Sequence, residues 1–167
     1  MTTRCECLKE LESQSIHSPG LVGPDEPIVY VLVESLTFEN GSVKALKHER
    51  LKKSEMSVCR AQYIKGSEAK ALTTDAMVAN GNDRVDRGYV YALCSEIRSI
   101  GLPSLGVGAF CVVDDAFEHY PAHAHLGYSN VDDKKNDRVA ARGNLLKLFQ
   151  KRGISYNWSG TPFLLAS

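Results

Sequence analysis

Residues 109–126 read AFCVVDDAFEHYPAHAHL, and this stretch contains two predicted β-strands. Residues 109–113 are continuously apolar, which is typical of a strand that is covered on both faces. Asp114 and Asp115 end that strand. Residues 119–126 then contain an alternation of side chains that is typical of a second strand. The stretch therefore predicts β structure on both sides of a short acidic connection.

Further predicted elements flank this stretch. Runs of β-branched and aromatic residues predict strands at 28–33, 57–63 and 89–94, and the pair Asn40-Gly41 predicts a tight turn. Apolar residues at helical spacing predict helices at 4–14, 69–79 and 134–150, the last with Val139, Leu145, Leu146 and Phe149 on its buried side. Strands and helices do not alternate strictly, so we predict an α+β fold with a four- to five-stranded mixed or antiparallel sheet and about three helices. We expect one domain over residues 1–167, with 1–27 as a peripheral segment.

The composition is that of a globular protein. Of the 167 residues, 43% are hydrophobic and 24% are charged, and the formal net charge is zero. The longest apolar run, Ile28 to Val33, is far shorter than the roughly 20 residues that a membrane span needs. The first residues show no secretion signal. We therefore expect a cytoplasmic protein that does not enter a membrane.

The chain has five cysteines at irregular spacing, which is not the pattern of a disulfide framework. We therefore expect reduced thiols, as in a cytosolic protein. Cys59 lies on a predicted strand and has two interpretations. It is either a small core residue or a nucleophile that pairs with a distant histidine.

The acidic and histidine-rich segment from Asp114 to His125 is the leading candidate site. If its second half is extended, His123 and His125 project from the same face of the strand. Two such imidazoles can share a divalent metal, with an oxygen ligand from Asp114 or Asp115. A metal held in this way can activate water for hydrolysis. The alternative is a polar loop and edge strand whose histidines are surface groups or form ordinary hydrogen bonds.

Two residues of the strand predicted at 57–63 are further candidates. Arg60 could bind a phosphate or carboxylate through its planar guanidinium, and Ser57 would lie on the opposite face. The order of Ser57-Val58-x-Arg60, residues 89–97, residues 110–114 and Pro121-x-His123-Ala124-His125 resembles that of an uncharacterised family of small bacterial proteins. This resemblance implies a bacterial cytosolic setting, and it suggests that Ser57, Arg60, Asp114 and His123 meet in one site.

Two basic stretches, residues 44–60 and 132–152, are candidates for binding an anionic partner. If their surfaces adjoin, they would attract an anionic ligand or a nucleic acid, although solvated faces are the usual explanation of such runs. The apolar segment from Trp158 to Leu165 either docks on a protein partner or folds back over its own core.

Two functions follow as hypotheses. The first is a small accessory protein that recognises a protein partner or an anionic ligand without turnover. The second is a metal-dependent hydrolase, a phosphodiesterase or nuclease, with Asp114, His123 and His125 as metal ligands and Arg60 for phosphate.

Overall fold

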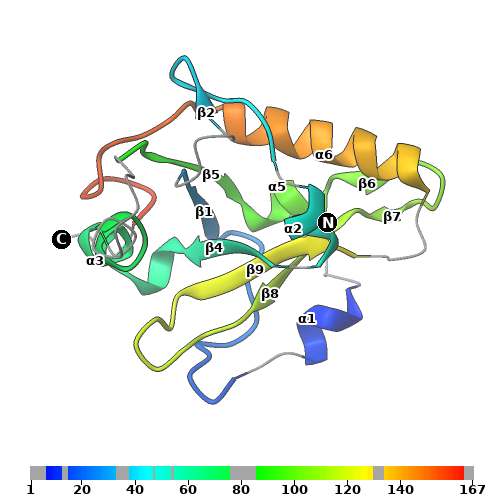
Figure 1. Cartoon of the computed structure of the whole chain (residues 1–167). Helices are drawn as coiled ribbons and strands as arrows, with labels where there is room; N and C mark the ends of the chain where they lie inside the picture. Colours follow the sequence, from blue (N-terminus) through cyan, green and yellow to red (C-terminus); the bar gives the residue numbers. More distant parts are fainter. Residues whose placement is uncertain are drawn as a thin grey trace.

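The computed structural model describes residues 7–12, 15–32, 38–46, 48–53, 55–75, 86–129 and 134–163. Its centre is a five-stranded sheet in the order β5-β1-β4-β9-β8, in which every neighbouring pair is antiparallel (Figure 1). The strands are β1 (Pro27–Val31), β4 (Met56–Arg60), β5 (Tyr89–Leu93), β8 (Phe110–Asp114) and β9 (His123–Tyr128). The predicted α+β class and strand number are therefore confirmed.

Two short hairpins accompany the sheet. β2 (Phe38–Glu39) pairs with β3 (Ser42–Val43), and β6 (Gly101–Leu102) pairs with β7 (Val107–Gly108). The first hairpin turns at Asn40 and Gly41, whose φ angles are 50° and 75°. Positive φ at both positions is what an Asn-Gly turn favours, so the predicted turn is confirmed.

The described residues contain five α-helices rather than about three. They are α1 (Leu8–Glu12), α2 (His48–Lys52), α3 (Gly66–Lys70), α5 (Cys94–Arg98) and α6 (Lys135–Gln150). A 3₁₀ turn (Ala61–Tyr63) follows β4, and a π-helical segment (Ala71–Asp75) continues α3. Four of the five helices have only five residues, too short to show a helical period in the sequence. The long helix, α6, lies where it was predicted.

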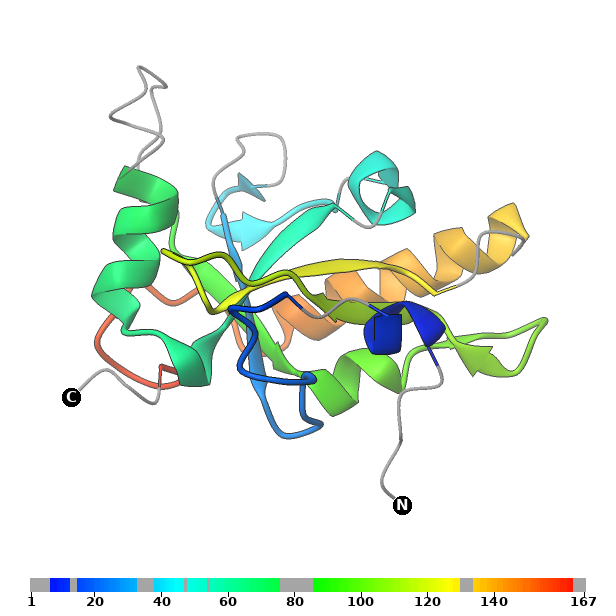
Figure 2. The same ribbon diagram turned by 90° about the horizontal axis from the view of Figure 1, so that it is seen from below.

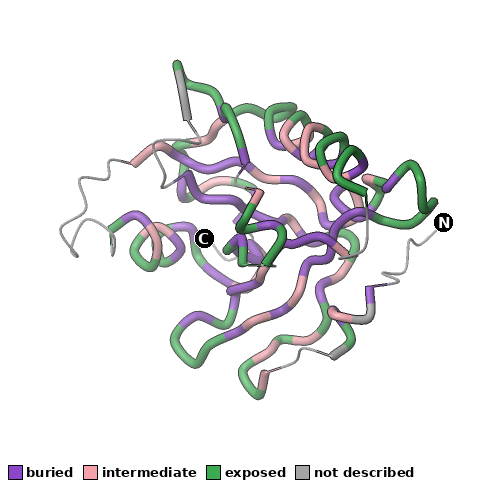
Figure 3. Tube along the Cα trace, turned by 45° about the vertical axis from the view of Figure 1, so that its right-hand side comes forward, coloured by how far each residue is buried: buried purple, intermediate pink, exposed green. Residues whose placement is uncertain are grey.

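α6 covers one face of the sheet, together with α2 and α5. Ala141, Leu145 and Phe149 of α6 are fully buried in the larger core cluster. Figure 3 shows how buried and exposed positions alternate along this helix, whereas the strands are largely buried. Val139, predicted on the buried side, is 52% exposed. That prediction is wrong because the buried stripe runs through 141, 145 and 149 at a spacing of four residues.

α3 and the C-terminal turn cover part of the other face. Trp158 and Phe163 pack with Tyr89 in a second core cluster, with ring centroids 4.8 Å and 5.2 Å from that of Tyr89. The Trp158 indole Nε1 donates to Asp86 Oδ2 at 2.9 Å. The C-terminal segment therefore folds back over its own core as far as Phe163, and Leu164 and Leu165 lie outside the described residues.

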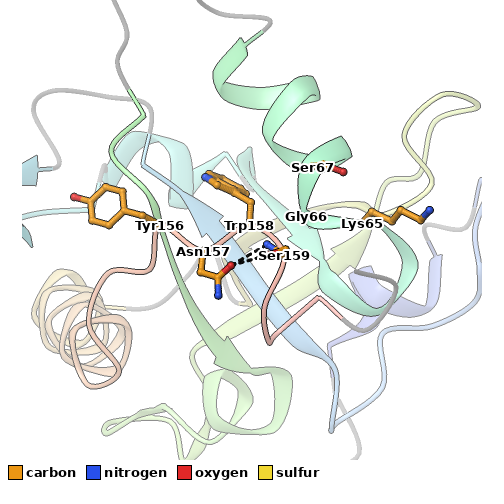
Figure 4. Close-up of a pocket in the computed structure, with 7 residues that line it drawn as sticks. All are labelled: Lys65, Gly66, Ser67, Tyr156, Asn157, Trp158 and Ser159. Carbon is orange, nitrogen blue, oxygen red and sulfur yellow. Dashed lines mark hydrogen bonds between the residues drawn. The ribbon is translucent and has the colours of Figure 1, made fainter. Parts of the chain in front are cut away.

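An open pocket of about 330 Å³ lies where this turn crosses α3. Its lining consists of residues 65–67 at the start of α3 and residues 156–159 of the turn (Figure 4). A side chain at Gly66 would place a Cβ 1.4 Å from the Trp158 carbonyl oxygen, so this position requires glycine. The backbones of two distant segments are therefore in close contact at the base of this pocket.

The N-terminal segment is fastened to the edge strand β8. A disulfide joins Cys7 to Cys111, which corrects the expectation that the cysteines are all reduced. Glu10, which is 4% exposed, accepts hydrogen bonds of 2.7 Å from the Val112 backbone N–H and from Arg98 Nη2. The helix α1 therefore lies against β8, as Figure 1 shows.

Among the helices of the described ranges, none combines the length and the apolar character that crossing a membrane demands.

Candidate metal centre

His123 and His125 project from the same face of β9. They are alternate residues of a regular strand, in which neighbouring side chains point to opposite faces. Their ring centroids are 4.7 Å apart and their planes are nearly perpendicular, at 83°. The predicted pairing of the two imidazoles is therefore confirmed.

Asp115 brings a carboxylate between the two rings. Its Oδ2 lies 3.4 Å from His123 Nδ1 and 3.3 Å from His125 Nδ1. Each of the three residues can offer one ligand atom such that all three atoms lie within 4.8 Å of one another. With metal–ligand distances near 2.0–2.1 Å, the ligand atoms of a tetrahedral zinc site are separated by about 3.3–3.4 Å. The two separations between the Asp115 oxygen and the imidazole nitrogens match that geometry.

Asp114 is not part of this cluster, which corrects the prediction that it is the metal ligand. β8 continues through Asp114, which pairs in register with Ala124, so Asp114 faces away from the two histidines. Its Oδ1 accepts a 2.9 Å hydrogen bond from Arg60 Nη1. Asp115, the first residue after the strand, provides the carboxylate instead.

Arg60 is the centre of a separate buried ion cluster. Its side chain is 0% exposed. Nε and Nη2 donate to the two carboxylate oxygens of Glu26 at 2.8 Å and 2.7 Å, and Nη1 donates to Asp114. The backbone oxygens of Gly20 and Leu21 accept from Nη1 and Nη2 at 2.7 Å and 3.2 Å. These five bonds use the five N–H groups of a guanidinium.

The four residues that were expected to meet are therefore divided between the two faces of the sheet. Ser57 and His123 lie together on one face, and Arg60 and Asp114 lie together on the other. The cause is the two-residue period of a strand, which separates Ser57 from Arg60 just as it separates Asp114 from Asp115. Arg60, with its donors used inside the protein, is not placed to bind a phosphate at the histidines.

His123 has a different partner at each ring nitrogen. Nδ1 lies 2.9 Å from the Asp115 carbonyl oxygen, and Nε2 lies 3.3 Å from Ser57 Oγ. With its proton on Nδ1, the ring donates to the carbonyl and accepts from Ser57. With its proton on Nε2, the ring donates to Ser57 and turns the Nδ1 lone pair toward Asp115. Because a hydroxyl both donates and accepts, Ser57 can hold the ring in either tautomer.

The cluster is supported on one side and open on the other. The rings of Phe117 and Tyr120 lie 4.9 Å and 5.3 Å from that of His123, centroid to centroid. The side chain of His123 is 9% exposed, whereas those of His125 and Asp115 are 27% and 36% exposed. A ligand from solvent can therefore reach His125 and Asp115 while His123 is held by its neighbours.

Burial lowers the pKa of His125 below the ordinary imidazole value. The charge of His123 lowers this pKa further, and the carboxylates of Asp115 and Glu55 act in the opposite direction. The neutral imidazole is consequently the main form of His125 at neutral pH. A neutral ring is the form that binds metal ions.

Cys59 is not placed as a nucleophile. It is 1% exposed, and burial raises the pKa of its thiol to about 12, although a hydrogen bond with Tyr120 acts to lower it. The thiolate, which is the reactive form, is therefore scarce at neutral pH. Of the two interpretations, the core residue is the one that the structure supports.

The sequence offered Asp114 and Asp115 as alternative carboxylate ligands. The choice depends on the residue at which β8 ends, which the sequence pattern did not fix. Glu26, the main partner of Arg60, was missed because no local pattern links residues 34 positions apart. No protein-family model, curated protein or solved structure shows a significant match to this chain. Function is therefore inferred from the geometry of the chain itself, and the resemblance to small bacterial proteins stays a prediction.

Proposed function

We propose that this protein is a metal-dependent hydrolase that binds a divalent transition metal ion, of the zinc type, at Asp115, His123 and His125. One observation carries the proposal: Asp115 Oδ2 lies 3.4 Å and 3.3 Å from the Nδ1 atoms of the two histidines. Two imidazoles and one carboxylate form a ligand set that is typical of zinc enzymes.

The exposure of the cluster favours a catalytic site over a structural one. Structural zinc sites are closed by four protein ligands, whereas catalytic sites have three and leave one position for water or substrate. Here three ligands come from the chain, and two of them are partly exposed. An ion at this position would lower the pKa of a water molecule and so supply a nucleophile at neutral pH.

Ser57 has a positioning role in this proposal. A histidine that binds metal through one nitrogen commonly donates the N–H of the other to a neighbouring acceptor, which fixes the ring and its tautomer. Ser57 Oγ, 3.3 Å from His123 Nε2, is such an acceptor. The hydroxyl can therefore support the tautomer whose Nδ1 would bind the ion in place of its 2.9 Å contact with the Asp115 carbonyl oxygen.

Phosphodiesters are not the substrates that we propose for this site. The phosphodiester hypothesis relied on Arg60 for phosphate, and Arg60 lies in its own ion cluster on the other face of the sheet. We therefore propose hydrolysis without a phosphate-specific pocket at the histidines.

The metal site is tested by calorimetric titration of the purified protein with Zn²⁺, and by the visible spectrum of the Co²⁺ form, which reports tetrahedral coordination. We expect one ion per chain. Asp115→Asn and His125→Ala should weaken binding by about 100-fold or more, and Ser57→Ala by about 10-fold, the lower end for a supporting residue. His119→Ala is the matched control, because this exposed histidine belongs to the same segment but not to the cluster. Absence of zinc binding, or an equal loss in His119→Ala, contradicts the site.

Hydrolysis is tested separately, with p-nitrophenyl acetate and bis(p-nitrophenyl) phosphate as generic substrates. The zinc-loaded protein should release p-nitrophenol from the acetate faster than the protein treated with a chelator, and Asp115→Asn should remove the difference. Tight zinc binding without any zinc-dependent turnover would support the metal site but refute the proposed hydrolase activity.

A further inference from the structure

The two basic stretches meet on the face of the sheet opposite the metal cluster. His48, the first residue of α2, has its Nδ1 3.2 Å from the hydroxyl of Tyr128 at the end of β9. The same hydroxyl donates to the Arg138 carbonyl oxygen of α6 at 3.5 Å. One tyrosine therefore joins the two helices, and the surfaces that the sequence left apart are neighbours.

The α6 side of this surface carries a stripe of three basic residues. Lys135, Arg138 and Arg142 are spaced at i, i+3 and i+7, which places them along one side of a helix. Asp137, the acidic residue of α6, is turned away from them. It is 7% exposed and accepts bonds of 3.0 Å from both the backbone N–H and the hydroxyl of Ser104.

The α2 side adds further positive charge. Lys52, at the end of α2, and Lys53, just after it, are both exposed, with Glu49 as the nearby acidic residue of the helix. The pKa of His48 is lowered first by burial and then by the charge of Arg142; Glu49 opposes this change, and Arg138 and Lys52 add smaller lowering effects. Basic residues of both α2 and α6 therefore act on the same imidazole, that of His48.

We propose that these basic residues form a binding surface for the phosphate backbone of a nucleic acid. The α2–α6 surface is defined by His48, Lys52, Lys53, Lys135, Arg138 and Arg142. Its α6 stripe extends from Lys135 to Arg142, seven helical steps or about 10 Å along the helix axis. That length suits a ligand with several charges at regular intervals, and arginine is the side chain whose planar donors best match phosphate oxygens.

The binding should be local and sensitive to salt. The whole chain has a formal net charge of zero, so attraction of a polyanion depends on a local basic surface and not on the overall charge. With such a footprint we expect dissociation constants of about 10⁻⁴–10⁻⁶ M and no preference for base sequence. The surface lies on the other face of the sheet from Asp115 and the histidines, so its function requires no metal.

The test is fluorescence anisotropy of labelled single-stranded DNA of about 20 nucleotides, with protein treated with a chelator. If four basic groups contact phosphates at about 0.7 released counterions each, affinity should fall about 50-fold between 50 and 200 mM salt. Lys52→Gln/Arg142→Gln takes one group from each helix. It should weaken binding at 50 mM salt and reduce the salt effect to about 7-fold.

The matched control is Lys65→Gln/Lys70→Gln, which changes the net charge equally. These lysines lie at and within α3, at the far end of the molecule from the start of α6 (Figure 2). The control should bind like the wild type, and circular dichroism should show both variants folded. Absence of binding at 50 mM salt, or an equal loss in both double variants, would overturn the proposal. So would stronger binding of a polyglutamate peptide of the same charge, because it would identify an acidic protein segment as the ligand.

Discussion

Replacement of Arg60 by methionine should destabilise the fold more than any surface change, because it removes the guanidinium that pairs with two buried carboxylates. Glu26 and Asp114 would keep their carboxylates, with side chains 5% and 1% exposed, but lose the guanidinium that pairs with both. Breaking a buried ion pair by removing one partner costs about 3–5 kcal/mol. The free energy of unfolding of a typical domain is only about 5–15 kcal/mol. Arg60→Met should therefore lose a large part of the stability.

Urea denaturation followed by circular dichroism measures this loss. With an m-value near 2 kcal/mol per molar urea, a change of 4 kcal/mol moves the midpoint by about 2 M. The variant Arg60→Met/Glu26→Met/Asp114→Leu removes all the charges together, and it should recover most of the loss because apolar groups of similar size can replace a buried ion cluster. A cost below about 1 kcal/mol for Arg60→Met would refute the buried network. If the Arg60→Met variant stayed folded but bound zinc more weakly, Arg60 would have to contribute to the metal site.

Two further predictions concern ionisable groups. Cys59, with its pKa raised to about 12, should resist iodoacetamide in the native protein at pH 8, as measured by mass spectrometry of its peptide, and rapid modification would contradict its burial. The pKa of Glu96 is lowered, chiefly because Arg152 Nη1 donates a 2.8 Å hydrogen bond to its carboxylate. The ion pair therefore stabilises the fold fully above the ordinary carboxyl pKa. This stabilisation is lost as the pH falls through the lowered pKa of Glu96. Arg152→Met should therefore cost under about 1 kcal/mol at neutral pH and less in acid, where Glu96 is protonated. Urea denaturation at both pH values measures the difference, and an equal cost at both would contradict the prediction.

The sequence predicted the elements whose patterns are local. α6 and the Asn40-Gly41 turn lie where expected, and the alternation of His123 and His125 was enough to place both rings on one face. The choice between Asp114 and Asp115 was harder, because a one-residue difference in where β8 ends transfers a side chain to the opposite face.

The remaining features depend on contacts between distant parts of the chain. Arg60 and Glu26 are 34 residues apart, and the disulfide partners Cys7 and Cys111 are separated by 104. No period or motif relates such pairs, so a phosphate-binding role for Arg60 was as consistent with the sequence as a structural one. The meeting of α2 with α6 also needed the fold, because Tyr128 joins them only through the course of β9.

The contact between α1 and β8 has a consequence for how copies of this protein behave toward one another. An edge strand exposes backbone donors and acceptors that can pair with a strand of a second molecule, which is a common route to aggregation. Glu10 occupies the Val112 N–H, where the carbonyl of an incoming strand would otherwise bind. The disulfide at the neighbouring Cys111 keeps this carboxylate in place. The chain thus blocks part of its own open edge with a charged side chain, and so discourages intermolecular sheet extension there.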